Sequence, residues 1–149
     1  MESRTLLNPH FIKVIKIKVV SLFIDEFNIP EDVTFKVDFD KTYYVDVNTN
    51  LVIINLNIVY SIPIDEQQNR KVLDCIVHNA FEVENIKDFV DEKGVVNLPL
   101  DLLSSLVGLS LTHSRAVISI HSAGTALGDT LIPVVNPIDF TKALFEEKK

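Results

Sequence analysis

The sequence predicts a single α+β domain over residues 1–149, in which a four-stranded antiparallel sheet is followed by a long helix and a short C-terminal helix. Two observations carry this prediction. Apolar and polar residues alternate with period two in the first half of the chain, which is typical of strands, whereas apolar residues recur every three or four positions in the second half. Strands followed by helices indicate an α+β fold.

Four segments of the first half are predicted strands. Alternation is clearest in Val33–Asp40 and Val52–Ile62, where one face is apolar and the other polar. His10–Ile24 is apolar on both faces, so we expect cover on both sides for part of its length. Val72–Ile86 supplies the fourth strand. Short turns join these segments, and parallel neighbours would need crossover segments that are missing here, so the sheet is predicted to be antiparallel.

A long helix is predicted from Asn97-Leu98-Pro99 to Gly124, where a glycine can take the left-handed conformation that ends a helix. The stretch Leu102–Leu127 contains one permanent charge, Arg115, but too many Ser, Thr and His residues for a membrane span. Apolar residues at steps of three and four predict one buried stripe, to which His113 also belongs. Its apolar residues are Leu102, Leu106, Leu109, Ala116, Ile120 and Ala123. A short helix is expected at Ile138–Glu147.

The opposite face of the long helix carries small or uncharged side chains where a solvated face would carry Lys and Glu. Its residues are Ser105, Gly108, Thr112, Arg115, Ser119 and Ser122. Small side chains let a second backbone come close, so we expect the first five to form the interface of a homodimer or a dimer of dimers. A plain polar outer face is the alternative. In either case we expect Arg115 to have a partner, because burying an unpaired guanidinium is costly.

Composition narrows the function classes. The net charge of −7 and the absence of a clustered Lys/Arg face argue against nucleic acid as a partner. A hydrophobic content of 47% is high for such a chain, so the surplus apolar surface must be hidden in a core, an interface or a binding groove. The single Cys75 cannot pair within the chain, and no secretory signal is evident, so we expect a cytoplasmic protein without membrane insertion.

No motif in the chain predicts catalysis, a metal or a cofactor. Asp46–Asn50 has the opening spacing of a calcium loop but lacks its glycine and its closing glutamate. His113 and His121 have no Cys or carboxylate at ligand spacing. Ser114 lies outside any nucleophile elbow, and Gly124–Gly128 lacks the Lys-Ser/Thr of a phosphate loop. We therefore predict that the protein is not an enzyme.

Short motifs in this element order resemble the SecB family of export chaperones. Cys75–Val83 is similar to the CEV-x-QAGIF-type strand of that family, and Leu98-Pro99 resembles its FPYAR helix start. Ser114-Arg115 followed by Leu131–Phe140 resembles the SRG…LAPVNFD-type ending. The chain departs from the pattern at Ala116, which replaces the glycine after the Ser-Arg pair, and it lacks the tail through which SecB commonly contacts the SecA motor.

The resemblance implies an ATP-independent holdase that binds unfolded or pre-export polypeptides in hydrophobic grooves and assembles as a dimer of dimers. By analogy, the client groove lies between the sheet and the terminal helix. Its expected residues are Phe35, Val37, Phe39, Phe140, Leu144 and Phe145. The partner could be SecA or a toxin-antitoxin module. A carrier of a small apolar ligand and an enzyme of unfamiliar type remain the alternatives.

Overall fold

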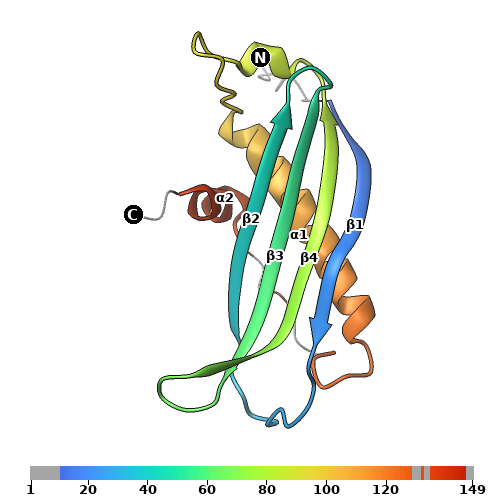
Figure 1. Cartoon of the computed structure of the whole chain (residues 1–149), viewed down its shortest axis with the longest axis vertical. Helices are drawn as coiled ribbons and strands as arrows, with labels where there is room; N and C mark the ends of the chain where they lie inside the picture. The colour runs from blue at the N-terminus through green and yellow to red at the C-terminus, as the bar shows by residue number, and fades with distance from the viewer. Residues whose placement is uncertain (1–10, 129–131, 133–134, 147–149) are drawn as a thin grey trace, which may run out of the picture.

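The computed structural model describes residues 11–128, 132 and 135–146, and it confirms the predicted α+β order of elements. A four-stranded antiparallel sheet is followed by a long and a short helix. The elements are β1 (Ile12–Ile24), β2 (Lys36–Asp46), β3 (Leu51–Pro63), β4 (Asn69–Val83), a 3₁₀ turn η1 (Ile86–Phe89), α1 (Leu100–Ser122) and α2 (Pro137–Phe145). Both helices lie on one face of the sheet, which we call its inner face (Figure 1).

The strand order in the sheet is β1-β4-β3-β2, and every neighbouring pair is antiparallel. Tight turns therefore join only β2 to β3 and β3 to β4. The expectation that short turns join all four strands was wrong for β1, which pairs with β4 instead of β2. Its connection to β2, residues 25–35, crosses the end of the sheet (Figure 1). Both edges of the sheet are thus formed by the first two strands.

Strand boundaries differ most at β2, which begins three residues later than predicted and continues to Asp46. Val33 belongs to a turn, in which its amide donates to the Pro30 carbonyl (3.4 Å), so this predicted first residue of the strand is not free to pair in the sheet. β4 ends at Val83, and Ile86 begins η1 instead of ending the strand. The predicted starting residue of β1, His10, and the predicted last residue of α2, Glu147, lie outside the described residues.

β1 is not covered on both sides, which corrects the prediction for this segment. As an edge strand it has one neighbour, and several of its large apolar side chains are exposed. The exposed residues on and beside this strand are Phe11, Val14, Ile15, Ile17, Val20 and Phe23. Its pairing with β4 shifts register between Val14 and Lys16 and again between Val19 and Ser21, as at β-bulges. Such an edge is a ready template for another polypeptide.

The core lies between the inner face of the sheet and α1. β3 and β4 supply its floor with fully buried side chains such as Ile54, Leu56, Val77 and Phe81. The buried residues form two clusters along α1, one around Leu102 and Leu106, the other around Leu111 and Ile118. Since α1 contacts β1, β3 and β4, it covers most of the inner face, while α2 packs against β2 and α1.

The buried face of α1 differs from the predicted stripe. Leu102 and Leu106 are buried as expected, but Ala116, Ile120 and Ala123 are exposed, and 73% of Ile120 is accessible. The residues that face the core in their place are Val107, Ser110, Leu111, Ser114, Ile118 and Ser122. Two of these serines bond to the helix itself, because Ser110 Oγ donates to the Leu106 carbonyl and Ser114 Oγ to the Ser110 carbonyl, each at 2.9 Å, whereas Ser122 Oγ has no hydrogen-bond partner among the described residues.

Both helix ends follow from local sequence. Gly124 has a φ of +79°, which confirms the predicted left-handed residue after α1. Asn136 caps α2, because its side-chain oxygen accepts hydrogen bonds from the amides of Ile138 (3.0 Å) and Asp139 (3.2 Å). With a mean hydropathy of 1.2, α1 has the length and composition of a membrane span, a property that core helices of folded domains share. Here α1 packs along the sheet.

Two isoleucines of α1 test the observed orientation of the helix. Ile118→Ala should lower the free energy of unfolding by about 2–5 kcal/mol, because the side chain is 3% exposed and its removal leaves a cavity. Ile120→Ala should cost less than about 0.5 kcal/mol, as is usual for an exposed position. Urea denaturation followed by circular dichroism measures both. Equal losses would mean that Ile120 is covered in solution as well.

Candidate functional site

The expected client-binding residues lie along one edge of the inner face, where α2 packs against β2 and the segment just before it. We call this surface the aromatic strip; it comprises Phe35, Val37, Phe39, Tyr43, Phe140, Leu144 and Phe145. All six predicted residues belong to it, and each is half-buried. The structure therefore brings the six together, while their part in client binding stays a prediction.

Edge-to-face ring contacts join the two sides of the aromatic strip. The Phe39 and Phe140 rings lie 4.9 Å apart between centroids at 80°, and the Tyr43 and Phe145 rings lie 5.1 Å apart at 85°. Such pairs add about 0.5–1.5 kcal/mol beyond the area they bury. α2 is nine residues long, so it is a small element that packs on an aromatic surface.

A cation lies over one end of the aromatic strip. The Lys41 ammonium is 4.5 Å from the centroid of the Phe145 ring, at the distance of a cation–π contact. Burial raises the pKa of the neighbouring Tyr43 phenol to about 12, so this hydroxyl stays neutral at physiological pH. The strip is consequently apolar along its length, with one positive charge near its end.

A second apolar depression lies on the other side of α2, between α1 and the beginning of α2. We call it the α1–α2 groove; its volume is about 570 Å³, and it is lined by Asp101, Ser104, Ser105, Gly108, Leu109, Thr112, Pro137 and Ile138. Ile138 is 46% exposed, and an added Cβ at Gly108 would meet no atom within 4 Å. Ser104 Oγ is buried without a hydrogen-bond partner. The groove could therefore accept an apolar side chain or a second helix.

The predicted oligomer face overlaps this groove. Ser105, Gly108 and Thr112 line it, and Ser119 lies exposed further along α1. Arg115 is different, because it is half-buried and its charge acts on the buried Tyr60 phenol. Burial raises the pKa of this phenol to about 12, and the positive charge of Arg115 opposes that rise. Arg115 is thus engaged within its own chain, as the expectation of a partner requires. Its contribution to an interface stays a prediction.

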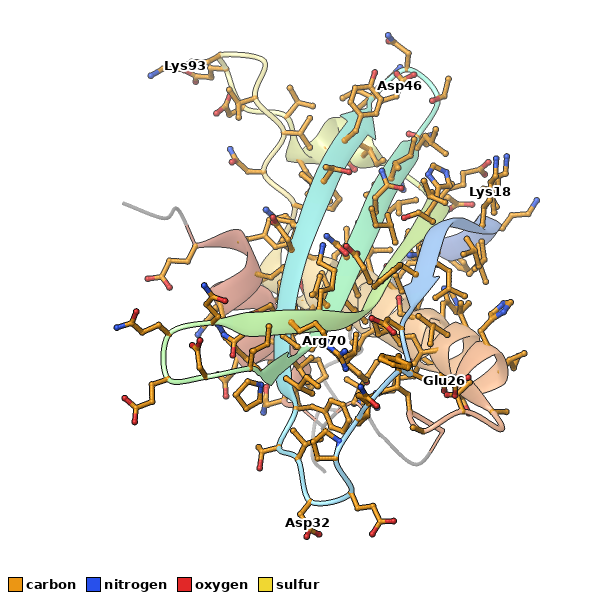
Figure 2. All side chains as sticks on the ribbon, turned by 60° about the horizontal axis from the view of Figure 1, so that its bottom comes forward. Lys18, Glu26, Asp32, Asp46, Arg70 and Lys93 are labelled. Atoms are coloured by element: carbon orange, nitrogen blue, oxygen red, sulfur yellow. The ribbon has the colours of Figure 1, made fainter. Side chains whose placement is uncertain are left out.

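The outer face of the sheet has a different character. There Asn55 Nδ2 donates to Thr42 Oγ1, and Asn55 Oδ1 accepts from His78 Nδ1, both at 2.8 Å. This polar row borders a depression of about 340 Å³ that also contains Ile76. Figure 2 shows Lys18, Asp46 and Lys93 projecting at the periphery of the molecule, on edge strands and loops. The large apolar side chains that build the core lie on the inner face and on the helices instead.

The single cysteine of the chain lies in the core. Burial raises the pKa of the Cys75 thiol to about 11, so this cysteine is a protonated core residue at neutral pH. Within the described part of the chain, no three His, Cys, Asp or Glu residues gather as metal ligands. The Asp46–Asn50 segment is the turn between β2 and β3, in which Asp46 Oδ1 accepts a hydrogen bond from the Asn48 amide (3.0 Å).

Comparison with solved structures identifies the architecture. The SecB-like chaperone Rv1957 of Mycobacterium tuberculosis, solved with a ChAD peptide from the HigA1 antitoxin Rv1956, matches 84% of this chain and 91% of its own with a TM-score of 0.59 and 11% identity. This chain has a SecB-like fold. A protein of unknown function from Streptococcus agalactiae matches at a TM-score of 0.33 and 15% identity, over 86% of this chain and 99% of its own.

No family model and no curated protein matches the sequence of this SecB-like chain. The resemblance in sequence motifs is therefore confirmed at the level of the fold. Of the Leu131–Phe140 motif, residues 131, 133 and 134 lie outside the described residues, and the remainder leads into α2, as expected from SecB.

Sequence reasoning missed several residues beside the predicted site. Tyr43 belongs to the aromatic strip, and Lys41 lies over its end, because β2 continues beyond Asp40, and the alternation Val37, Phe39, Lys41, Tyr43 could have shown this. Lys41 interrupts the apolar pattern and hid it. The α1–α2 groove had no comparable signal, since Leu109 and Ile138 are 29 positions apart and meet only through tertiary packing.

Removing the cap of α2 should loosen this side of the aromatic strip. Asn136→Ala deletes two hydrogen bonds to the first turn and should destabilise the helix by about 1 kcal/mol. We expect faster amide exchange in α2 and unchanged exchange in β3 and β4. Asn136→Asp, which can still cap, is the matched control. Wild-type exchange in the alanine variant would contradict the role of the cap in holding α2.

Proposed function

We propose that the protein is an ATP-independent holdase chaperone that binds unfolded polypeptides through the aromatic strip. The observation that carries the proposal is the SecB-like fold together with half-buried aromatic residues on both sides of the β2–α2 contact. An unfolded client offers scattered apolar side chains and free backbone groups, so the binding surface needs apolar area and adaptability more than a specific set of polar residues.

The size of α2 supports this use of the strip. α2 is nine residues long and exposes Lys142, Ala143 and Glu146 on its outer side. A short helix can shift or be displaced at lower cost than a long one, which would open Phe39 and Phe140 to a client's side chains. The Lys41 ammonium at the end of the strip could also donate a hydrogen bond to a carboxylate or carbonyl group of the client.

A toxin-antitoxin client is favoured by a specific observation. The SecB-like neighbour was solved with a peptide of an antitoxin, whereas nothing comparable favours SecA. We therefore propose that the clients include an antitoxin segment exposed before it folds. An antitoxin segment and any other unfolded polypeptide would bind by the same principle, because a holdase acts by mass action on whatever unfolded segment it binds.

We further propose that the chain is a homo-oligomer. Two surfaces support association: the exposed apolar edge strand β1, and the small-residue face of α1 at Ser105, Gly108 and Thr112. An edge strand with exposed apolar side chains on both faces is an aggregation risk unless another chain covers it. A two-fold assembly would remove this edge and the surplus apolar surface together.

The wild-type protein should suppress aggregation of a denatured client at near-stoichiometric ratios without ATP. Phe145→Asp and Phe140→Asp should weaken protection more than they weaken the fold, because they place a charge in the aromatic strip. Phe27→Asp is the matched control, since Phe27 is 69% exposed on the loop after β1 and is not a residue of the strip. Light scattering of client aggregation and circular dichroism of the variants measure the two effects.

Two outcomes would contradict this proposal. Folded wild-type protein that protects none of several unrelated clients, nor an antitoxin, would exclude the holdase function. An apolar small molecule that co-purifies with a monomer would instead favour the carrier. Equal loss of protection in Phe27→Asp would mean that the clients bind elsewhere.

Enlarging the small face of α1 tests the proposed assembly. Gly108→Leu or Ser105→Leu should cost the interface about 1–3 kcal/mol through overpacking and reduce the mass in solution. Gly108 has open space around it within the chain, so the substitution should leave the subunit folded. Light scattering after size exclusion measures the mass, and Ser119→Leu extends the test along the helix. An unchanged mass in all three variants would remove α1 from the interface.

A further inference from the structure

A polar bridge crosses the middle of the apolar core. His113 of α1 and Asn79 of β4 meet there, with His113 Nδ1 2.7 Å from Asn79 Oδ1. Asn79 is fully buried, and its amide nitrogen lies 3.3 Å from the Ile54 carbonyl and 3.2 Å from the Val77 carbonyl, to which it donates. Since both neighbours of the amide nitrogen are acceptors, the Asn79 oxygen is fixed as an acceptor, and His113 Nδ1 carries the hydrogen.

The bridge lies at the boundary between the two core clusters. Val77 belongs to the cluster around Leu111, and Phe81 belongs to the cluster around Leu106, with Asn79 between them on the same face of β4. The His113 ring also stacks on Phe81 at 6.4 Å and 22°. His113 therefore joins α1 to β4 near the midpoint of the helix.

Among the residues that the structure describes on β1, β3, α1 and α2, the positions that face His113 carry no charge. Ile17 of β1 and Ile54 of β3 are the cross-strand partners of Asn79, and Lys16 and Lys18, which flank Ile17, alternate to the other face. On α1, the positions one turn away are Leu109, Ser110, Ala116 and Val117. α2 turns Phe140, Thr141 and Leu144 inward and exposes Asp139 and Lys142.

Protonation of this ring is accordingly unfavourable in the folded chain. The proton would be added at Nε2, since Nδ1 already carries a hydrogen, and it would place a positive charge among apolar side chains. Burial lowers the pKa of His113 below its ordinary value of 6.5. A lowered pKa in the folded state means that the bridge contributes its full stability above about pH 6.5, and that this contribution is lost as the pH falls below that value.

We propose that the His113–Asn79 bridge is an acid-sensitive latch that fixes α1 on the sheet and, when His113 is protonated, lets α1 loosen and expose the apolar inner face. Loosening would begin at the midpoint of α1, where the two clusters meet. The ring is half-buried, so it can reach water by a small displacement of the helix. The latch is a property of the fold and operates with or without a client.

Hydrogen exchange of the α1 amides tests the latch between pH 7.5 and 5.5, a range above the ordinary pKa values of Asp and Glu. Corrected for intrinsic exchange, protection of the amides around His113 should fall several-fold in the wild type. His113→Gln, which keeps a donor for Asn79 but cannot be protonated, should show no such fall. His121→Gln is the matched control, because His121 is exposed on the same helix and should leave the wild-type response intact.

His113→Leu keeps the test decisive if the glutamine variant does not fold, since leucine fills the same site without a titratable group and has to give the same flat response. Binding of an apolar fluorescent dye over the same pH range reports exposure of the inner face. A wild type without pH-dependent protection would overturn the latch, as would a His113→Gln variant that loses protection like the wild type.

Discussion

The fold depends on the burial of one face of the sheet beneath α1. Four long strands present a continuous row of Val, Ile, Leu and Phe side chains on their inner face, and an antiparallel sheet of this kind is stable only when that face is covered. α1 lies lengthwise over β3, β4 and β1, while α2 covers what remains at β2 (Figure 1). The two helices differ in how firmly they can be held, because α1 has 23 residues and α2 has nine.

Some polar groups inside this core have their own partners. Ser110 and Ser114 of α1 bond back to carbonyls one turn earlier, which lets these two hydroxyl groups pack against an apolar sheet without unsatisfied donors. Asn79 is satisfied by two carbonyls of the sheet and by His113. Buried polar contacts of this sort give specificity of position, since only one placement of α1 satisfies them.

The apolar surface that remains outside the core is unevenly placed. It gathers at the β1 edge, along the aromatic strip and in the α1–α2 groove, while Lys18, Asp46 and Lys93 project from edge strands and loops (Figure 2). Surfaces of this type are used for binding and assembly in proteins that act on other polypeptides. The proposed holdase function and the proposed oligomer therefore draw on the same excess of apolar residues, on different parts of the chain.

The sequence by itself determined the element types, the antiparallel sheet and the left-handed glycine after α1, because period-two alternation and helix-ending residues act locally, whereas the six client-binding candidates rested on the resemblance to SecB. Only the tertiary structure decided the order β1-β4-β3-β2, the exposure of β1 and the buried face of α1. Strand order depends on contacts between distant segments such as Ile12 and Val83. On α1, Ser110 and Ser114 could face the core because their hydroxyls bond to the helix itself, and in this orientation of the helix Ile118 is buried while Ile120 is exposed.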